Sequence, residues 1–480
     1  MTARDEPPGS AVLRPGPGKT GRNHTADTGR DHTADTGRVH PADTPLPVYA
    51  PPERDGPRHP VLAELLADLR ARERSGEPAL AYYDDSPFQP PQDPPGGADP
   101  DSFRQFVLKV HSRCNLACTY CYIYRGADST WRDHPSRAEE TVMRQTAHRI
   151  AEHARTHRLR VLRVDLHGGE PLLSGPEPVV TYVDLVRAAV PMGTEVVATV
   201  QTNGTLLTGR VLDRLAGAGI LVGLSLDGGT ARLNRRRPDH AGRPSWPALR
   251  RAATLLAEGH TDTYAGILCT IDPATAADEV YTSLRAFAPP TLDFLLPHTH
   301  WGTRPPGRHR PAPAPYGDWL VRAFDLWWND TAPGRPRVRL FAEIVTLVLG
   351  GSSRTEAVGL SPVTAVVVET DGTIERIDSL RATYHGASTT GLDVFRHSFD
   401  TALRHPGITV LRDGAAALAE ECRECPVLRV CGGGNHAHRY APTTGHFRHP
   451  SVHCPDLEQL VRHAAARVGE QLSATSRTLT

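Results

Sequence analysis

The cysteines of this chain limit its possible folds more than any other feature. Eight cysteines occur among 480 residues. No apolar run reaches the roughly 18 residues of a membrane span, and the polar N-terminus lacks the layout of a signal peptide, so we expect a cytoplasmic protein. In that setting cysteines serve as metal ligands or catalytic groups more often than as disulfides. The sequence therefore predicts metal centres.

Seven of the eight cysteines fall into two sets. The first set lies in CNLACTYC and consists of Cys114, Cys118 and Cys121. The second set lies in the last quarter of the chain and consists of Cys422, Cys425, Cys431 and Cys454. The remaining one, Cys269, lies inside an apolar strand, which favours a core residue over a ligand.

Apolar runs of strand length alternate with segments of helical period after residue 102, as is typical of a parallel α/β sheet. We expect strands over residues 103–110, 159–167, 194–202, 219–227, 263–272 and 291–297. We expect helices over 136–157, 177–190, 207–217, 246–258 and 278–287, the first with Ser136 as its N-cap and Glu139 three residues on. Six such units predict a partial (β/α)6 barrel, in which chemistry collects at the C-terminal ends of the strands.

Composition divides the chain into four parts. Residues 1–59 contain the octads GRNHTADT, GRDHTADT and GRVHPADT, which have no apolar face and predict a disordered tail. Residues 60–102 predict one short helix and a Pro-rich linker, so the folded core should begin near Phe103. We expect the barrel over 103–335 and a cysteine-rich extension over 336–480.

The charge balance excludes two classes of partner. Lys+Arg and Asp+Glu each number 54, so neither nucleic acid nor an anionic membrane is favoured. Among the basic residues only Lys19 and Lys109 are lysines.

The first cysteine set predicts a cluster with one open iron. Three thiolates hold three irons of a 4Fe–4S cluster, whereas four are needed to fill it. Structural zinc has closed four-coordinate ligation, and catalytic zinc is usually helped by His or Glu. Zinc and a disulfide therefore remain as weaker alternatives.

Cys-x3-Cys-x2-Cys, with Tyr120 before the last Cys, resembles the radical S-adenosylmethionine (SAM) motif. The resemblance implies that the open iron chelates SAM and that one electron cleaves it to a 5′-deoxyadenosyl radical. It also implies that the polar groups after the next three strands face SAM, with the GGEP segment on the methionyl ammonium and the last two residues near the ribose. These groups are Gly168, Gly169, Glu170, Thr202, Asn203, Ser225 and Asp227.

The second cysteine set has enough thiolates for either a zinc ion or a closed cluster. Spacing alone leaves the two near parity. Beside a radical SAM motif, the pattern resembles the SPASM extension, which implies one auxiliary 4Fe–4S cluster. Asn435 and Ile377 stand where that pattern often has cysteines, so we expect the inner of the two SPASM clusters to be absent.

Residues 103–460 as a whole resemble the FxsB family of radical SAM/SPASM peptide maturases. The shared segments are FVLKVHSRCNLACTYCYIY, LHGGEPLL, QTNGTLL, SLDGG, ETDGTIERIDSL and CGGGNHAHRY. The resemblance implies a ribosomal precursor peptide as substrate, a flavodoxin or ferredoxin as electron donor, and a three-residue cyclophane as product. Thioether or formylglycine formation, or an inactive peptide-binding scaffold, remain as alternatives.

Asp378 is the residue that we expect to act on the substrate. It follows the position of the missing inner-cluster cysteine, and related enzymes have an acidic residue there. We expect it to accept a proton or to orient the substrate, because an aromatic ring attacked at carbon must lose a proton. Asp227 and His298 are other candidates for the base, and a turn-capping role for Asp378 is the alternative.

Overall fold

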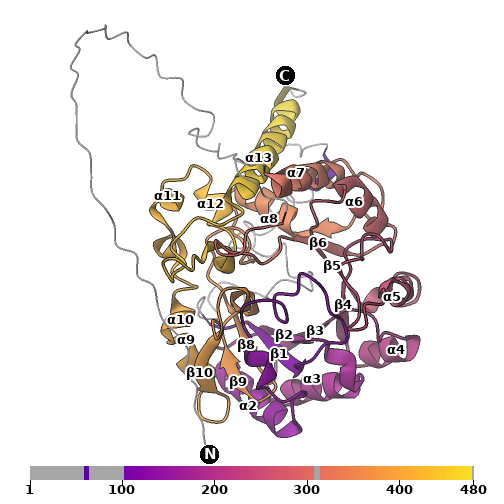
Figure 1. The fold of residues 1–480 in the computed structure, drawn as a ribbon, viewed down its shortest axis with the longest axis vertical. Coiled ribbons are helices and arrows are strands. Elements are labelled where there is room, and N and C mark those ends of the chain that lie inside the picture. The colour runs from indigo at the N-terminus through magenta and orange to yellow at the C-terminus, as the bar shows by residue number, and fades with distance from the viewer. Residues whose placement is uncertain (1–58, 64–101, 307–313, 478–480) are drawn as a thin grey trace, which may run out of the picture. The chain divides into compact units, whose positions relative to one another are not determined.

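A computed structural model describes residues 59–63, 102–306 and 314–477 of the chain, with side chains to residue 474 (Figure 1). The predicted octad tail and the Pro-rich linker lie outside the described residues. In the described residues no helix combines the length and apolar character needed to cross a membrane.

A single ten-stranded sheet organises the chain, in the order β10-β9-β8-β1-β2-β3-β4-β5-β6-β7. Strands β1 to β6 lie side by side in sequence order, and each is parallel to the next. Their bounds are β1 Gln105–His111, β2 Val161–Gly168, β3 Glu195–Thr202, β4 Ile220–Ser225, β5 Tyr264–Thr270 and β6 Thr291–Leu295. The predicted partial barrel is confirmed, because each apolar run forms a strand that is buried between its neighbours and the helices.

The connecting helices lie outside the curved sheet (Figure 1). They are α2 Glu140–Thr156, α3 Glu177–Ala189, α4 Gly209–Gly217, α5 Trp246–Gly259 and α6 Ala277–Arg285, with short 3₁₀ turns η3 Thr130–Arg132, η4 Pro171–Ser174 and η5 Thr261–Thr263. The expected N-cap is wrong: α2 begins at Glu140 and its N-cap is Glu139. Ser136 is instead tied to the end of β1, where its carbonyl accepts the Ser112 N–H at 2.8 Å and the Ala138 N–H reaches the Val110 carbonyl at 3.0 Å.

The C-terminal part of the chain completes the same sheet. Its strands are β7 Arg337–Val338, β8 Ala365–Val368, β9 Thr373–Glu375 and β10 Thr389–Asp393. Strand β8 pairs in parallel with β1, and β7 pairs in parallel with β6. Strands from residues 336–480 therefore extend the sheet that residues 103–335 begin.

Helices of this part cover the β6 side and carry the second cysteine set (Figure 1). The longer ones are α7 Pro315–Trp328, α8 Arg339–Val348 and α13 Cys454–Arg477, and α13 packs on both others. The short ones are η6 Asp378–Ala382, α9 Phe399–Leu403, α10 Pro406–Thr409, η7 Gly414–Ala417, α11 Glu420–Arg423, α12 Leu428–Cys431 and η8 His436–Arg439.

The core extends further toward the N-terminus than the sequence indicates. Val61 and Leu62 are 2% and 0% exposed, and the His59 ring stacks on Trp328 at 4.2 Å between centroids. Burying one such aliphatic side chain contributes about 1.5–3 kcal/mol, so this segment belongs to the folded body although Phe103 was expected to begin it.

Candidate active site

The first cysteine set lies on the loop that follows β1, at the C-terminal edge of the parallel strands. The three thiols, which are partly exposed, are those of Cys114, Cys118 and Cys121. Residues 236–240 hold this loop from behind: the Ala117 N–H donates to Pro238 at 2.8 Å, and the Thr119 N–H donates to Arg236 at 2.9 Å. These thiols lie at the sheet edge where the sequence predicts the reactive centre.

Without a bound cation these cysteines favour the neutral thiol. Burial raises the pKa of Cys114 to about 12 and also raises that of Cys118. Arg237, which is 4% exposed, opposes the increase at Cys118 through its positive charge. Metal ligation requires the thiolate, so a cationic cluster would supply the charge that the pocket lacks.

Gly168 and Gly169 are glycines because the cysteine loop crosses them closely. A Cβ on Gly168, whose φ is +156°, would meet the His111 carbonyl oxygen at 2.1 Å, and one on Gly169 would meet that of Arg113 at 2.5 Å. The Gly169 N–H donates to His111 at 2.9 Å, continuing the pairing of β1 with β2. The glycine pair therefore fixes the start of the cysteine loop.

Glu170 organises the site from inside the protein. Its side chain is fully buried and accepts hydrogen bonds from the Leu172 N–H at 3.0 Å, the Thr202 hydroxyl at 2.8 Å and the Asn203 N–H at 2.8 Å. Its carboxylate thus fixes the end of β3, with two of these bonds on Oε1 and one on Oε2. The Asn203 amide in turn donates to the Cys114 sulfur at 3.7 Å.

Tyr120 and Asp227 form one buried pair with a residue that the sequence analysis missed. The Tyr120 hydroxyl donates to Asp227 at 2.5 Å, and Arg237 donates to the same hydroxyl at 2.8 Å. Asp227 also accepts the Thr270 N–H at 3.1 Å, and the Arg236 guanidinium lies over the Tyr120 ring at 4.9 Å. The NRRRPDH run could have signalled this role, since buried arginines require such partners.

Ser225 presents a hydroxyl at the C-terminal end of β4. It ends β4, remains partly exposed, and its hydroxyl accepts a hydrogen bond from the Gln201 amide at 2.8 Å. Unlike Asp227, it therefore keeps a donor hydrogen for a ligand.

The second cysteine set encloses a cavity of about 60 Å³. All four of its thiols line this cavity: Cys422, Cys425, Cys431 and Cys454. One water molecule needs only about 10–15 Å³, so the space suits a group of several atoms. All eight cysteines lie in the described part of the chain, and none forms a disulfide.

The spacing of the sulfurs differs from that of a zinc site. Four sulfurs around one zinc lie roughly 3.8 Å apart, from Zn–S distances of about 2.3 Å. In the described residues, the group of three or more ligand atoms within 4.8 Å of one another is His153, His157 and Asp400, and neither cysteine set qualifies. The His153 Nε2 accepts the Phe103 N–H and its Nδ1 contacts Asp400, so that group is a hydrogen-bond network.

The positions that depart from the SPASM pattern are used by the protein itself. Ile377 is 6% exposed and packs in a small apolar cluster with Leu380 and Ala387. The Asn435 amide donates to Glu356 at 2.8 Å. Both side chains therefore have partners within the protein.

Asp378 faces the interior of the barrel beside β1. Its carboxylate pairs with Lys109, which is 3% exposed and lies 3.3 Å from the His167 Nδ1, and with Arg381 at 3.3 Å. Burial alone would raise the pKa of Asp378, but the charges of Lys109 and Arg381 lower it to about 2. The sequence analysis missed Lys109, although an isolated lysine in a chain that otherwise uses arginine was a signal.

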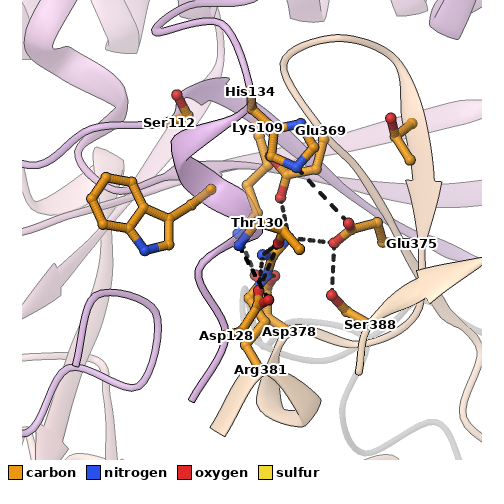
Figure 2. A network of polar contacts seen from close by, with 12 residues as sticks. Lys109, Ser112, Asp128, Thr130, His134, Glu369, Glu375, Asp378, Arg381 and Ser388 are labelled. Atoms are coloured by element: carbon orange, nitrogen blue, oxygen red, sulfur yellow. Dashed lines mark hydrogen bonds and ion pairs between the residues drawn. The ribbon is translucent and has the colours of Figure 1, made fainter. Parts of the chain in front are cut away.

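Arg381 is the centre of the network that holds Asp378 in place (Figure 2). It is 1% exposed and donates to Asp128 at 2.6 Å, to Glu369 at 2.6 Å and to Glu375. Burial raises the pKa of Glu375 to about 7, which limits the negative charge around this single guanidinium. The network ties the β8–β9 hairpin and η6 to the loop after the cysteines.

A cavity of about 120 Å³ lies at the C-terminal end of β6. His298, Glu356, Asn435 and His438 are among its lining residues. The His298 ring contacts Tyr122, the neighbour of Cys121, at 4.7 Å between centroids, so the cavity adjoins the cysteine loop. Glu356 and His438 carried no signal in the sequence, because their segments have neither strand nor helix periodicity.

Comparison with known proteins identifies the domain around the first cysteine set. The model of the radical SAM superfamily matches residues 108–269. A serine-type anaerobic sulfatase-maturating enzyme of Klebsiella pneumoniae is 26% identical over 351 residues, covering 72% of this chain and 85% of the relative. A cysteine-type anaerobic sulfatase-maturating enzyme of Clostridium perfringens is 26% identical over 332 residues, covering 68% and 87%.

Solved structures agree with this assignment at the level of the fold. Native anSMEcpe with bound AdoMet superimposes with a TM-score of 0.64 at 23% identity, covering 76% of this chain and 98% of that chain. The same protein with AdoMet and the Cp18Cys peptide gives 0.64 at 24% identity.

Proposed function

Because this chain is an enzyme with a radical SAM domain, we propose that it removes two hydrogens from two side chains of a ribosomally made peptide. The two side chains are thereby joined in a three-residue cyclophane. The single observation that carries the peptide substrate is the similarity over most of the chain to enzymes that mature sulfatases. A structural neighbour that holds a peptide together with AdoMet adds support. The cyclophane rests on the resemblance to the FxsB family.

Cys114, Cys118 and Cys121 would hold the 4Fe–4S cluster that binds SAM. When bound, this group supplies the 5′-deoxyadenosyl radical that abstracts a hydrogen atom. The protein contributes the surroundings: Glu170 fixes the end of β3, the Asn203 amide contacts a cysteine sulfur, and Ser225 offers a hydroxyl.

The four C-terminal cysteines would hold one auxiliary 4Fe–4S cluster. The 60 Å³ cavity and the wide sulfur spacing support a cluster over zinc. Ile377 and Asn435 support the absence of an inner cluster, since both have structural partners. A flavodoxin or ferredoxin in the cytoplasm would supply the electron.

Asp378 is proposed to orient the substrate rather than to take its proton. A carboxylate with a pKa of about 2 and two cationic partners is a weak proton acceptor at neutral pH, whereas its fixed position suits a hydrogen-bond acceptor.

Formylglycine formation is the second candidate, because the relatives are named for sulfatase maturation. The missing inner-cluster cysteines count against it, since sulfatase-maturing enzymes usually keep both auxiliary clusters.

One experiment separates these functions. The anaerobically reconstituted enzyme is given SAM, dithionite and one of two synthetic peptide sets. The first contains an aromatic residue two positions before an aliphatic or polar residue, and the second contains a single Ser or Cys and no aromatic residue. We expect the enzyme to form 5′-deoxyadenosine. Peptides of the first set should lose two hydrogens, and their mass spectra should show no backbone fragmentation within the three crosslinked residues. A hydrazine-reactive aldehyde in the second set would establish formylglycine formation, and no SAM cleavage would establish a scaffold.

A further inference from the structure

Any oxidation that removes two hydrogens has three parts: a hydrogen atom, a proton and an electron leave the substrate. The radical takes the hydrogen atom, so some group of the protein must accept the proton. Asp378 is engaged in ion pairs with Lys109 and Arg381. Asp227 is engaged with Tyr120, Thr270 and Arg237. The proton acceptor is therefore a different group near the cysteine loop.

The cavity at the end of β6 has the position that this acceptor needs. One wall is His298, whose ring contacts Tyr122 directly after Cys121. Two other lining residues, Glu356 and His438, come from the C-terminal part of the chain, and the His438 ring lies 5.5 Å from the His298 ring between centroids. A side chain that enters beside the cysteine loop would thus meet groups from both parts of the fold.

The imidazoles of this cavity have nitrogens with no hydrogen-bond partner in the described structure. These are the His298 Nδ1 and both ring nitrogens of His438, which is 3% exposed. Buried polar atoms of native proteins are nearly always satisfied by protein or by water, so these nitrogens leave the cavity able to hydrogen-bond a polar group that enters it. Burial lowers the pKa of His298 to about 4 and that of His438 well below its usual value, so both rings are neutral at pH 7.

Glu356 is the acidic group that remains available in this cavity. Its side chain is exposed rather than packed and lines the cavity, and one oxygen accepts a hydrogen bond from the Asn435 amide at 2.8 Å. It also lines a second cavity of about 40 Å³ with His436 and Arg439.

Two arginines and one aspartate contribute charge at Glu356. Arg339 of α8 is paired with Asp293 of β6, and Arg439 is the last residue of η8. Desolvation raises the pKa of Glu356 to about 7, Asp378 adds to the increase, and Asn435, Arg339 and Arg439 oppose it. The neutral rings of His298 and His438 add no charge. A proton acceptor is most effective when its pKa is close to the working pH.

We propose that Glu356 is the proton acceptor of the reaction, and that the cavity which it shares with His298 and His438 receives the reacting side chain of the peptide. This rests on the proposed function. The substrate carbon first loses a hydrogen atom to the 5′-deoxyadenosyl radical, which becomes 5′-deoxyadenosine. For a cyclophane, the resulting carbon radical would form a C–C bond to the aromatic ring, and the C–H bond at that ring carbon would then break with its proton going to a Glu356 oxygen. For an aldehyde product, the substrate O–H bond would break in the same way. The remaining electron goes to a one-electron acceptor of the iron–sulfur or flavin class.

The test compares Glu356→Gln with a matched control, Glu343→Gln. Glu343 on α8 is fully buried and has a pKa raised to about 7 by burial, but it is absent from the lining of the cavity. The assay uses whichever of the two synthetic peptide sets the wild-type enzyme oxidises. We expect Glu356→Gln to cleave SAM at the wild-type rate and to lose product by about 100-fold, consistent with the range for general base catalysis. Glu343→Gln should keep both activities.

Two further measurements keep the proposal testable if a variant is unstable. Wild-type product formation should rise with pH through about 7, because the acceptor must be deprotonated, and Glu356→Asp should retain that profile at a lower rate. The infrared difference between wild type and Glu356→Gln, recorded without peptide or SAM, should contain a protonated carboxyl band that titrates near pH 7.

The outcomes separate this inference from the proposed function. If wild type oxidises neither peptide set, the proposed function fails. If wild type forms product and Glu356→Gln forms it equally well, or with an unchanged pH profile, Glu356 is not the acceptor. A carboxyl band that titrates near pH 4 would also overturn the proposal.

Discussion

The three thiols after β1 and the four thiols of the C-terminal part lie in opposite surroundings. The first set is on one loop beside the polar ends of β2, β3 and β4, and its sulfurs are partly exposed. The second set comes from α11, the residues after it, α12 and the first turn of α13, and it encloses a cavity with apolar walls that include Val427 and Leu428. Each set has one buried arginine close by, Arg237 or Arg439. The difference teaches that the first set takes its polar neighbours from other strands, whereas the second set lies among its own short helices and apolar side chains.

The strongest test of this comparison removes the first set of thiols. The triple variant Cys114→Ala, Cys118→Ala and Cys121→Ala should abolish SAM cleavage and leave about half of roughly eight irons, since a four-iron cluster would remain at the second set. Iron analysis and 5′-deoxyadenosine assay after anaerobic reconstitution measure both. Zinc in the remaining site, or loss of all iron, would contradict the contrast between the two sites.

The reciprocal variant removes one ligand of the closed site. Cys431→Ala should lower the iron content by up to half and abolish peptide oxidation, while SAM cleavage continues, because none of the residues proposed to bind SAM lines this cavity. Cys269→Ala is the control, since Cys269 lies in the core and outside both sites. Loss of SAM cleavage in Cys431→Ala would mean that the two sites are not independent.

A third variant tests the ion pair beside the open site. Asp378→Asn keeps the shape of the side chain but removes the charge that fixes Lys109, so product should fall about 100-fold through misplacement of the substrate. SAM cleavage should be spared. The pKa of Asp378 is about 2, so its carboxylate stays ionised between pH 3 and 5. The wild-type product rate should therefore show no inflection in this range that arises from Asp378. Wild-type crosslinking in Asp378→Asn would exclude the orienting role.

A smaller effect is expected from the hydroxyl of Tyr120. Tyr120→Phe leaves Asp227 with one hydrogen bond fewer in a buried position, which costs about 1–3 kcal/mol. We expect a lower midpoint of urea unfolding and weaker SAM binding by calorimetry. Tyr440→Phe in the C-terminal part is the comparison variant. Equal losses in both would show that the Tyr120 hydroxyl has no special role at the open site.

The smallest effect should come from deletion of residues 1–59. This truncation removes the His59 ring from Trp328 but keeps Val61 and Leu62, so both cysteine sites should assemble and SAM cleavage should persist. A truncation that also removes residues 60–63 should be less stable by about 2–5 kcal/mol, as for removal of buried aliphatic side chains. Failure of the shorter truncation to bind iron would assign a structural role to the tail.

The sequence alone determined the features that depend on neighbours in the chain. The alternation of apolar runs predicted the six parallel strands, because the period of burial is set locally by the geometry of strand and helix. The position of the first cysteine set, directly after the first apolar run, predicted the site after β1. Prediction from the local sequence failed at Ser136, where pairing with β1 overrides the local capping pattern. It also failed at Val61 and Leu62, whose burial depends on a distant surface.

Only the tertiary structure decided which acidic groups are available for chemistry. Lys109 and Asp378 are 269 residues apart in sequence, and Glu356 and Asn435 are 79 apart, yet each pair forms one contact. The pKa of a carboxyl depends on its desolvation and on charges within a few ångströms, and the sequence does not specify either. For this reason a carboxylate that the sequence favoured as a base proved to be an ion-paired one, and a glutamate without any sequence signal lies in the cavity.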